Sequence, residues 1–180
     1  MTAGLRERLD AMIETYKAET VGGQILAVAE LETEFPHRIR LMCEAIQREP
    51  ETFKFTCFEF ALDLRGSREV RRIAADQPNG SPLYPSPEFV EYLIAERLGE
   101  VLAQDASPGD LVVYSDGTRT THAGVLVAPG LVISKWGLMH VWVHGTLEVP
   151  ARYGSDVRYF KRLRRGECVE AFLVFARRFV

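Results

Sequence analysis

The feature of this sequence that most constrains its fold is a change of pattern at Pro108-Gly109-Asp110. Before this tripeptide, apolar residues recur every three or four positions, which is the spacing of amphipathic helices. After it, they form short runs rich in β-branched and aromatic residues, separated by Gly, Pro and Asp turns. Helices followed by a meander of strands are typical of an α+β domain. The sequence therefore predicts N-terminal helices packed on one face of an antiparallel β-sheet.

Local signals delimit the individual elements. The first half is expected to hold three helices: an apolar stripe from Leu5 to Tyr16, a second stripe of Ile39, Met42, Cys43 and Ile46, and a helix with Ser86 as N-cap and Pro87 at its first position. Strands are expected at residues 111–114, 122–127, 131–136, 141–143 and 157–160. The tail, residues 167–179, fits a strand or a helix equally well. One domain is expected over 1–180, made of a helical extension (1–51), a core (52–165) and a C-terminal element (166–180).

Composition sets the class of protein. A chain of 180 residues with 47% hydrophobic and 26% charged residues matches an ordinary globular domain. No apolar run reaches the roughly 18–20 residues of a membrane span, and no export signal is visible, so we expect a cytoplasmic protein or one secreted without a classical signal peptide. The net charge is −3, with a basic balance confined to residues 150–180. This basic segment lacks interleaved aromatic residues, so it favours a solvated face over nucleic-acid binding.

One of the three cysteines stands out by its surroundings. Thr56 and Glu59 have the spacing of a capping box, and Phe55 and Phe60 the spacing of a hydrophobic staple. Cys57 would then be the first residue of a helix, where unpaired N–H groups and the helix dipole stabilise a thiolate. Burial of Cys57 against the phenylalanines is the alternative.

A thiolate nucleophile needs a base, and His122 is the histidine best placed to supply one. It begins a predicted strand, and the small residues Ala123 and Gly124 beside it would let a helix approach the sheet closely. Metal binding by His122, His140 and His144 with Cys57 is disfavoured, since no carboxylate accompanies them and no CxxC pair exists. We expect no metal and no other cofactor.

At this point the chain resembles a family. Cys57 at a helix start, followed by Pro108-Gly109-Asp110-Leu111-Val112 and then by His122-Ala123-Gly124-Val125, resembles the core of the NlpC/P60 cysteine peptidases, which have a papain-like fold. The resemblance covers roughly residues 55–160. It implies that Cys57 is the nucleophile and His122 the base. The family's usual Asp-Cys-Ser-Gly is replaced here by Thr56-Cys57-Phe58-Glu59.

The residue that would orient His122 is left open. By the resemblance it lies about a dozen positions further on, at Ser134, where the family usually has His, Asn or Gln. Ser134 or Lys135 shares the face of His122 depending on the hairpin register, because a one-residue slip exchanges faces. His140 and His144 are alternatives for the same role, and His144 fits the resemblance better.

Two functions follow from these residues. The first is a cysteine hydrolase that cleaves an amide or peptide bond through Cys57, His122 and an acyl-enzyme; the resemblance implies a cell-wall peptide as substrate. The second is a catalytically inactive binding or effector module on the same fold. In either case the helices of residues 1–51 could form a surface for a protein partner.

Overall fold

The fold was analysed in a computed structural model that describes residues 2–15, 26, 29–33, 39–41, 55–75, 83–136 and 140–179. Its helices are α1 (Thr2–Thr15), α3 (Cys57–Ala61), α4 (Arg68–Ala75), α5 (Pro87–Glu96) and α6 (Arg165–Ala176). Short 3₁₀ turns are η2 (Ala103–Asp105), η3 (Ala151–Tyr153) and η4 (Arg177–Phe179). The strands are β1 (Ile39–Leu41), β2 (Glu100–Val101), β3 (Leu111–Ser115), β4 (Thr120–Ala128), β5 (Leu131–Trp136), β6 (His140–Gly145) and β7 (Asp156–Phe160).

The strands form one antiparallel sheet in the order β1-β6-β5-β4-β3-β7-β2. The predicted α+β class and the five predicted strands are confirmed, since β3 to β7 cover them. Ser86 caps α5 and Pro87 begins it, also as predicted. Among the described residues, no helix has both the length and the apolarity needed to cross a bilayer.

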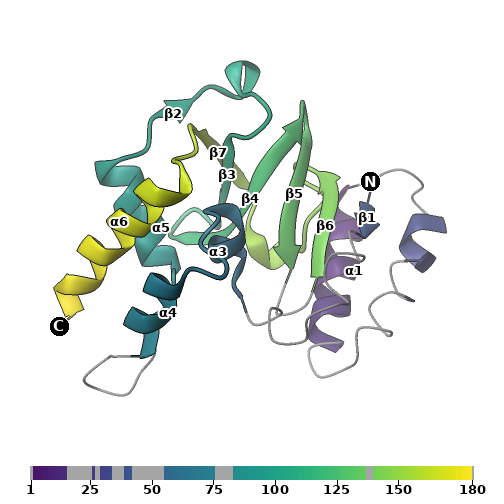
Figure 1. The fold of residues 1–180 in the computed structure, drawn as a ribbon. Coiled ribbons are helices and arrows are strands. Elements are labelled where there is room, and N and C mark those ends of the chain that lie inside the picture. The colour runs from purple at the N-terminus through teal and green to yellow at the C-terminus, as the bar shows by residue number, and fades with distance from the viewer. Residues whose placement is uncertain are drawn as a thin grey trace.

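Helices cover both faces of the sheet, so the prediction of helices on one face is wrong (Figure 1). On one face, α3, α4, α5 and α6 pack against a core that includes Val113, Ala123 and Val125; we call this the α3 face. On the other, α1 packs against a core that includes Tyr114 and Trp142; we call this the α1 face. Because side chains alternate along a strand, the central strands supply apolar residues to both faces, and each face requires its own cover.

Two further expectations are corrected or resolved. The helix expected from Ile39 is wrong at its start, because Ile39–Leu41 forms β1 and pairs with β6 at the sheet edge. This long-range pairing overrides the helical spacing of the local apolar residues. Met42, Cys43 and Ile46 lie outside the described residues. The tail that fitted a strand or a helix is the helix α6, which buries Cys168.

A β-bulge in β4 fixes the register of the β4–β5 hairpin. Ala128 pairs with Leu131, but Leu126 pairs with Val132, so Val127 is the extra residue. The register that results places Ser134 opposite Gly124. Since Gly124 and His122 point to the same face, Ser134 shares the α1 face with His122, and Lys135 points to the α3 face.

Candidate functional site

Cys57 begins α3 as the sequence predicts. The hydroxyl of Thr56 accepts a hydrogen bond from the Glu59 N–H (3.1 Å), and the Glu59 carboxylate accepts one from the Thr56 N–H (2.6 Å). The rings of Phe55 and Phe60 stack with centroids 6.3 Å apart, which completes the staple. These local contacts set the direction in which the chain enters the helix, and they place Cys57 over the sheet.

The surroundings of Cys57 do not favour a thiolate. Its side chain is partly buried and packs on the core of the α3 face. Burial raises the pKa of the Cys57 thiol to about 11, although a backbone hydrogen bond from Ala123 and the charge of Lys135 act in the opposite direction. Burial therefore opposes the expected thiolate.

His122 lies on the opposite face of the sheet from Cys57. Its neighbour Ala123 belongs to the core of the α3 face, so the His122 ring points to the α1 face. There it stacks on Tyr153, with centroids 4.0 Å apart and an angle of 5° between the rings, and it lies 5.4 Å from Tyr114. The structure thus does not bring the predicted nucleophile and the predicted base together, because alternation along β4 sends them to different layers.

His122 is fully buried, and neither ring nitrogen has a hydrogen-bond partner among the described residues. Burial lowers the pKa of His122 well below its ordinary value, and the nearby His144 and Lys135 lower it further. A neutral imidazole with no orienting partner is a packing residue in this arrangement.

Ser134 and His144 meet each other and not His122. His144 Nδ1 lies 2.8 Å from the Gly145 carbonyl, which can only accept, so Nδ1 carries the proton. His144 Nε2 therefore accepts from the Ser134 hydroxyl (2.8 Å), and Ser134 Oγ accepts from the Trp136 indole N–H (3.0 Å). Ser134 and His144 are fully buried, and burial lowers the pKa of His144 to about 4. This closed chain of hydrogen bonds accounts for both predicted site residues as structural groups.

Lys135 is the chemically unusual residue on the α3 face. It is fully buried, and its Nζ lies 4.9 Å from the centre of the Phe55 ring. Burial lowers the pKa of the Lys135 ammonium to about 8, while interactions with Cys57 and Glu59 act in the opposite direction. In the sequence, the alternation of side chains along β5, combined with the register of the β4–β5 hairpin, could have placed Lys135 on the face of Cys57.

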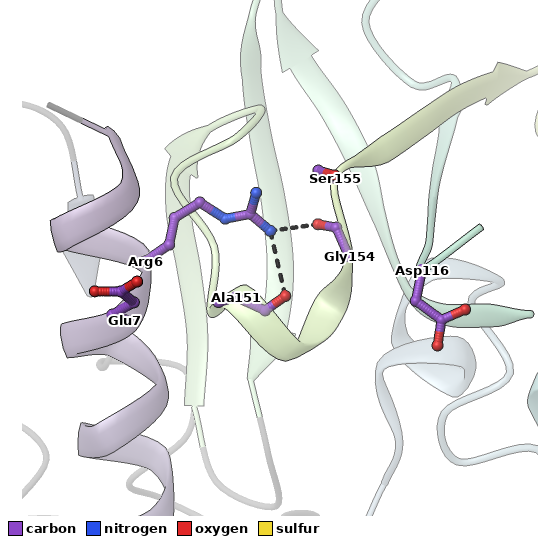
Figure 2. A pocket seen from close by; sticks show the side chains of 6 residues that line it. All are labelled: Arg6, Glu7, Asp116, Ala151, Gly154 and Ser155. Carbon is purple, nitrogen blue, oxygen red and sulfur yellow. Dashed lines mark hydrogen bonds between the residues drawn. The ribbon is translucent and has the colours of Figure 1, made fainter. Parts of the chain in front are cut away.

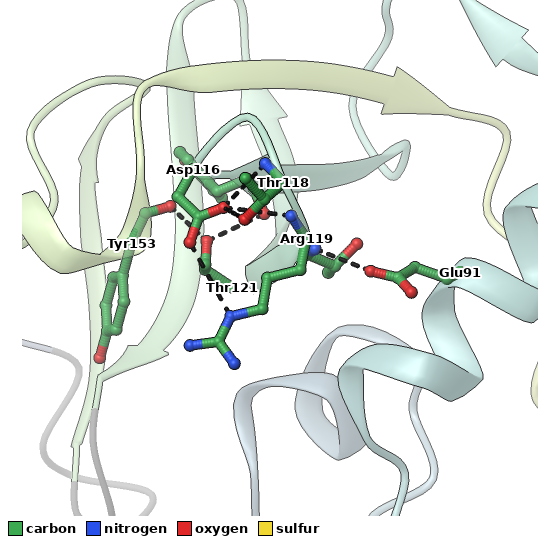
Figure 3. A network of polar contacts seen from close by, with 8 residues as sticks. Glu91, Asp116, Thr118, Arg119, Thr121 and Tyr153 are labelled. Carbon is green, nitrogen blue, oxygen red and sulfur yellow. Dashed lines mark hydrogen bonds and ion pairs between the residues drawn. The ribbon is translucent and has the colours of Figure 1, made fainter.

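The start of β4 is held from two sides (Figure 3). The Glu91 carboxylate of α5 accepts from the Thr120 N–H (2.9 Å), and the Thr121 hydroxyl donates to the Tyr153 carbonyl of η3 (2.6 Å). In the preceding turn, Asp116 accepts from the N–H groups of Thr118 and Arg119. These contacts fix the position of β4, whose Ala123 contacts Cys57.

A pocket of about 320 Å³ lies away from Cys57, between α1, η3 and the β3–β4 turn. Its lining includes Arg6, Glu7 and Asp116 (Figure 2). The Arg6 guanidinium donates to the carbonyl oxygens of Ala151 and Gly154, so its charge ties α1 to η3. The pocket shares no residue with the surroundings of Cys57.

The remaining sequence candidates do not form a site. Within the described part of the chain, no three His, Cys, Asp or Glu residues are grouped so that they could hold a metal ion. His140 lies on β6, where it pairs with Trp136 of β5.

Comparison with known proteins identifies no relative of this chain: no family model matches it, and neither a curated protein nor a solved structure does. In the part of the chain that the structure describes, the fold and the site define an α+β protein whose seven-stranded antiparallel sheet carries a partly buried cysteine and a buried lysine on the same face.

Proposed function

We propose that this protein is a cysteine hydrolase of papain-like type, similar to the NlpC/P60 peptidases, which cleaves an amide or peptide bond with Cys57 as nucleophile. The observation that carries the proposal is the position of Cys57 at the first residue of a capped helix that packs on the central strand β4. Cys57 lies on the same face of the sheet as the buried Lys135. The Cys57 sulfur attacks the substrate carbonyl, the amine leaves, and water hydrolyses the resulting thioester.

The substrate class follows from the resemblance. NlpC/P60-like motifs favour a cell-wall peptide among amide substrates, and the order of Cys57, Pro108-Gly109-Asp110 and His122-Ala123-Gly124 along the chain supports that choice. The separation of Cys57 from His122 means that the proton acceptor for the thiol must lie on the α3 face.

Acyl transfer to the thiol tests the proposal. We expect the full chain to release nitrophenolate from p-nitrophenyl acetate with formation of an acetyl-enzyme, visible by intact mass, and to hydrolyse peptides from a cell-wall digest. Cys57→Ala should abolish both. Cys168→Ala, at a cysteine buried in α6, is the matched control and should retain both. Acetylation that persists unchanged in Cys57→Ala would contradict the proposal.

A binding module on the same fold is the second candidate. The raised pKa of Cys57 and its separation from His122 favour it, since a decayed site would lose the thiolate–imidazole pair first. Under this alternative no variant of the chain forms an acyl-enzyme, and Cys57→Ala binds a cell-wall digest as tightly as the wild type does.

A further inference from the structure

Three ionisable side chains lie on the α3 face, and we call them the Cys57–Lys135–Glu59 cluster. Cys57 and Glu59 lie on the first turn of α3, and Lys135 comes from β5. The capping box fixes the Glu59 carboxylate through the Thr56 N–H at 2.6 Å. The Phe55 ring lies next to the cluster, with Lys135 Nζ 4.9 Å and Arg65 Cζ 5.2 Å from its centre. The cluster thus combines residues from two elements, α3 and β5.

Burial and neighbouring charges act in opposite directions on each group of the cluster, and burial has the larger effect. Burial lowers the pKa of Lys135 to about 8 and raises that of Cys57 to about 11. Near neutral pH the thiol keeps its proton, and the deprotonated share of Lys135 is small but grows to about half at pH 8. Glu59 is itself partly buried, which raises its pKa, and the charges of Lys135 and Arg71 lower it. Arg65 also lies at the Phe55 ring that Lys135 contacts, and His122 lies on the opposite face of the sheet.

We propose that Lys135 is the general base for Cys57, in a cysteine–lysine pair that replaces the cysteine–histidine pair, and that Glu59 is a positioning residue that keeps the Lys135 side chain directed at the thiol. This proposal rests on the proposed hydrolase function. The geometry behind it is the shared face: alternation along β5 sends Lys135 to the side of Cys57, and alternation along β4 sends His122 away from it.

The chemical step balances without any further reagent. The neutral Lys135 amine takes the proton of the Cys57 thiol while sulfur bonds to the substrate carbonyl carbon. The resulting ammonium gives this proton to the leaving amine, and the carbon–nitrogen bond breaks to leave a thioester. Water then loses a proton to the Lys135 amine as its oxygen bonds to the carbonyl carbon. The carbon–sulfur bond breaks, and the ammonium returns its proton to sulfur.

The experiment measures acetylation of Cys57 by p-nitrophenyl acetate between pH 6 and 10 in the full chain. In the wild type, the rate should rise with pH and reach half its maximum near pH 8, as Lys135 loses its proton. Lys135→Arg keeps the charge but cannot accept a proton, so the rate at pH 8 should fall 100-fold or more. The matched control is Lys161→Arg, at an exposed lysine paired with Asp110, and it should match the wild type.

A second pair of variants separates the roles of the other groups. Glu59→Gln keeps an amide oxygen that can accept from the Thr56 N–H but removes the charge. Since Glu59 raises the pKa of Lys135, the half-maximal pH should shift downward in this variant. His122→Phe should leave the profile unchanged, because the ring of His122 faces the other layer.

Each result decides a different part of the proposal. An unchanged rate in Lys135→Arg would overturn the role of Lys135 while Cys57 remains the nucleophile. If acetylation of Cys57 in His122→Phe no longer depended on pH, His122 and not Lys135 would be the base. An unchanged pH profile in Glu59→Gln would refute the positioning role of Glu59 and leave the role of Lys135 intact. If Lys135→Arg does not fold, competitive acetylation of wild-type lysines by acetic anhydride replaces it; a Lys135 amine that gains reactivity only above pH 10 would refute the proposal.

Discussion

Ser134 and Lys135 are neighbours on β5, yet they belong to different chemical environments. Ser134 completes a hydrogen-bonded chain with Trp136 and His144 under α1, and Lys135 faces Cys57 under α3. The side chains of Ser134, Lys135, Trp136 and His144 are almost completely excluded from solvent. At such positions the identity of the nearest partner decides whether a polar group is structural or reactive.

The Ser134 hydroxyl is expected to stabilise the fold without serving the chemistry. Ser134→Ala leaves the Trp136 N–H and His144 Nε2 buried without their partner, which should lower the free energy of unfolding by about 2–3 kcal/mol. Urea denaturation at pH 7 measures this loss. The control is Ser155→Ala, at an exposed serine, which should change little. Acetylation of Cys57 in Ser134→Ala should follow the wild-type pH profile; a 100-fold loss would instead make Ser134 part of the site.

At the scale of elements, the parts predicted from the sequence are those with local causes. The capping box of α3, the Ser86 cap of α5 and strands β3 to β7 all depend on residues a few positions apart. Edge strand β1 pairs with β6 about a hundred positions away, so local spacing gave the wrong element. The candidate site divides in the same way. Cys57 was predicted at a helix start, but its partner depends on the bulge at Val127, which changes the face of every residue after it.

The β4–β5 contact at Gly124 should be sensitive to a single methyl group. A Cβ at Gly124 would lie 2.7 Å from Val132 Cγ1, 2.9 Å from the Ile133 carbonyl oxygen and 2.9 Å from Ser134 Cβ. Gly124→Ala should therefore push β5 away and lower stability by about 1–3 kcal/mol. Gly99→Ala is the control, since no atom lies within 4 Å of its added Cβ. Thermal melting followed by circular dichroism measures both; equal midpoints would show that the two strands move apart freely.

For the whole molecule, the two-sided sheet has a consequence for acid stability. Covering the α1 face buries His122 and His144, and burial lowers the pKa of both below the value of an exposed histidine. The unfolded chain exposes both rings and binds protons there around pH 6.5. Protons therefore favour the unfolded state as soon as the pH falls below that value.

We expect the free energy of unfolding to fall steadily between pH 7 and pH 4.5. Below pH 6.5 the unfolded state binds more protons than the folded state, so stability decreases with decreasing pH, and for His144 the decrease ends near its folded pKa of about 4. A shift of this size corresponds to about 3 kcal/mol at its limit. Urea titrations at pH 7, 6, 5 and 4.5 measure the slope.

His122→Phe isolates the share of His122 in that slope. Phenylalanine retains a ring to stack on Tyr153 and removes two buried nitrogens that have no partner among the described residues, so stability at pH 7 should be equal to that of the wild type or higher. Below pH 6.5 the advantage of the variant should grow, because only the wild-type chain has a histidine to protonate at this position on unfolding. Parallel curves for the two proteins would mean that His122 can take up its proton in the folded state, and that the α1 face admits a charge.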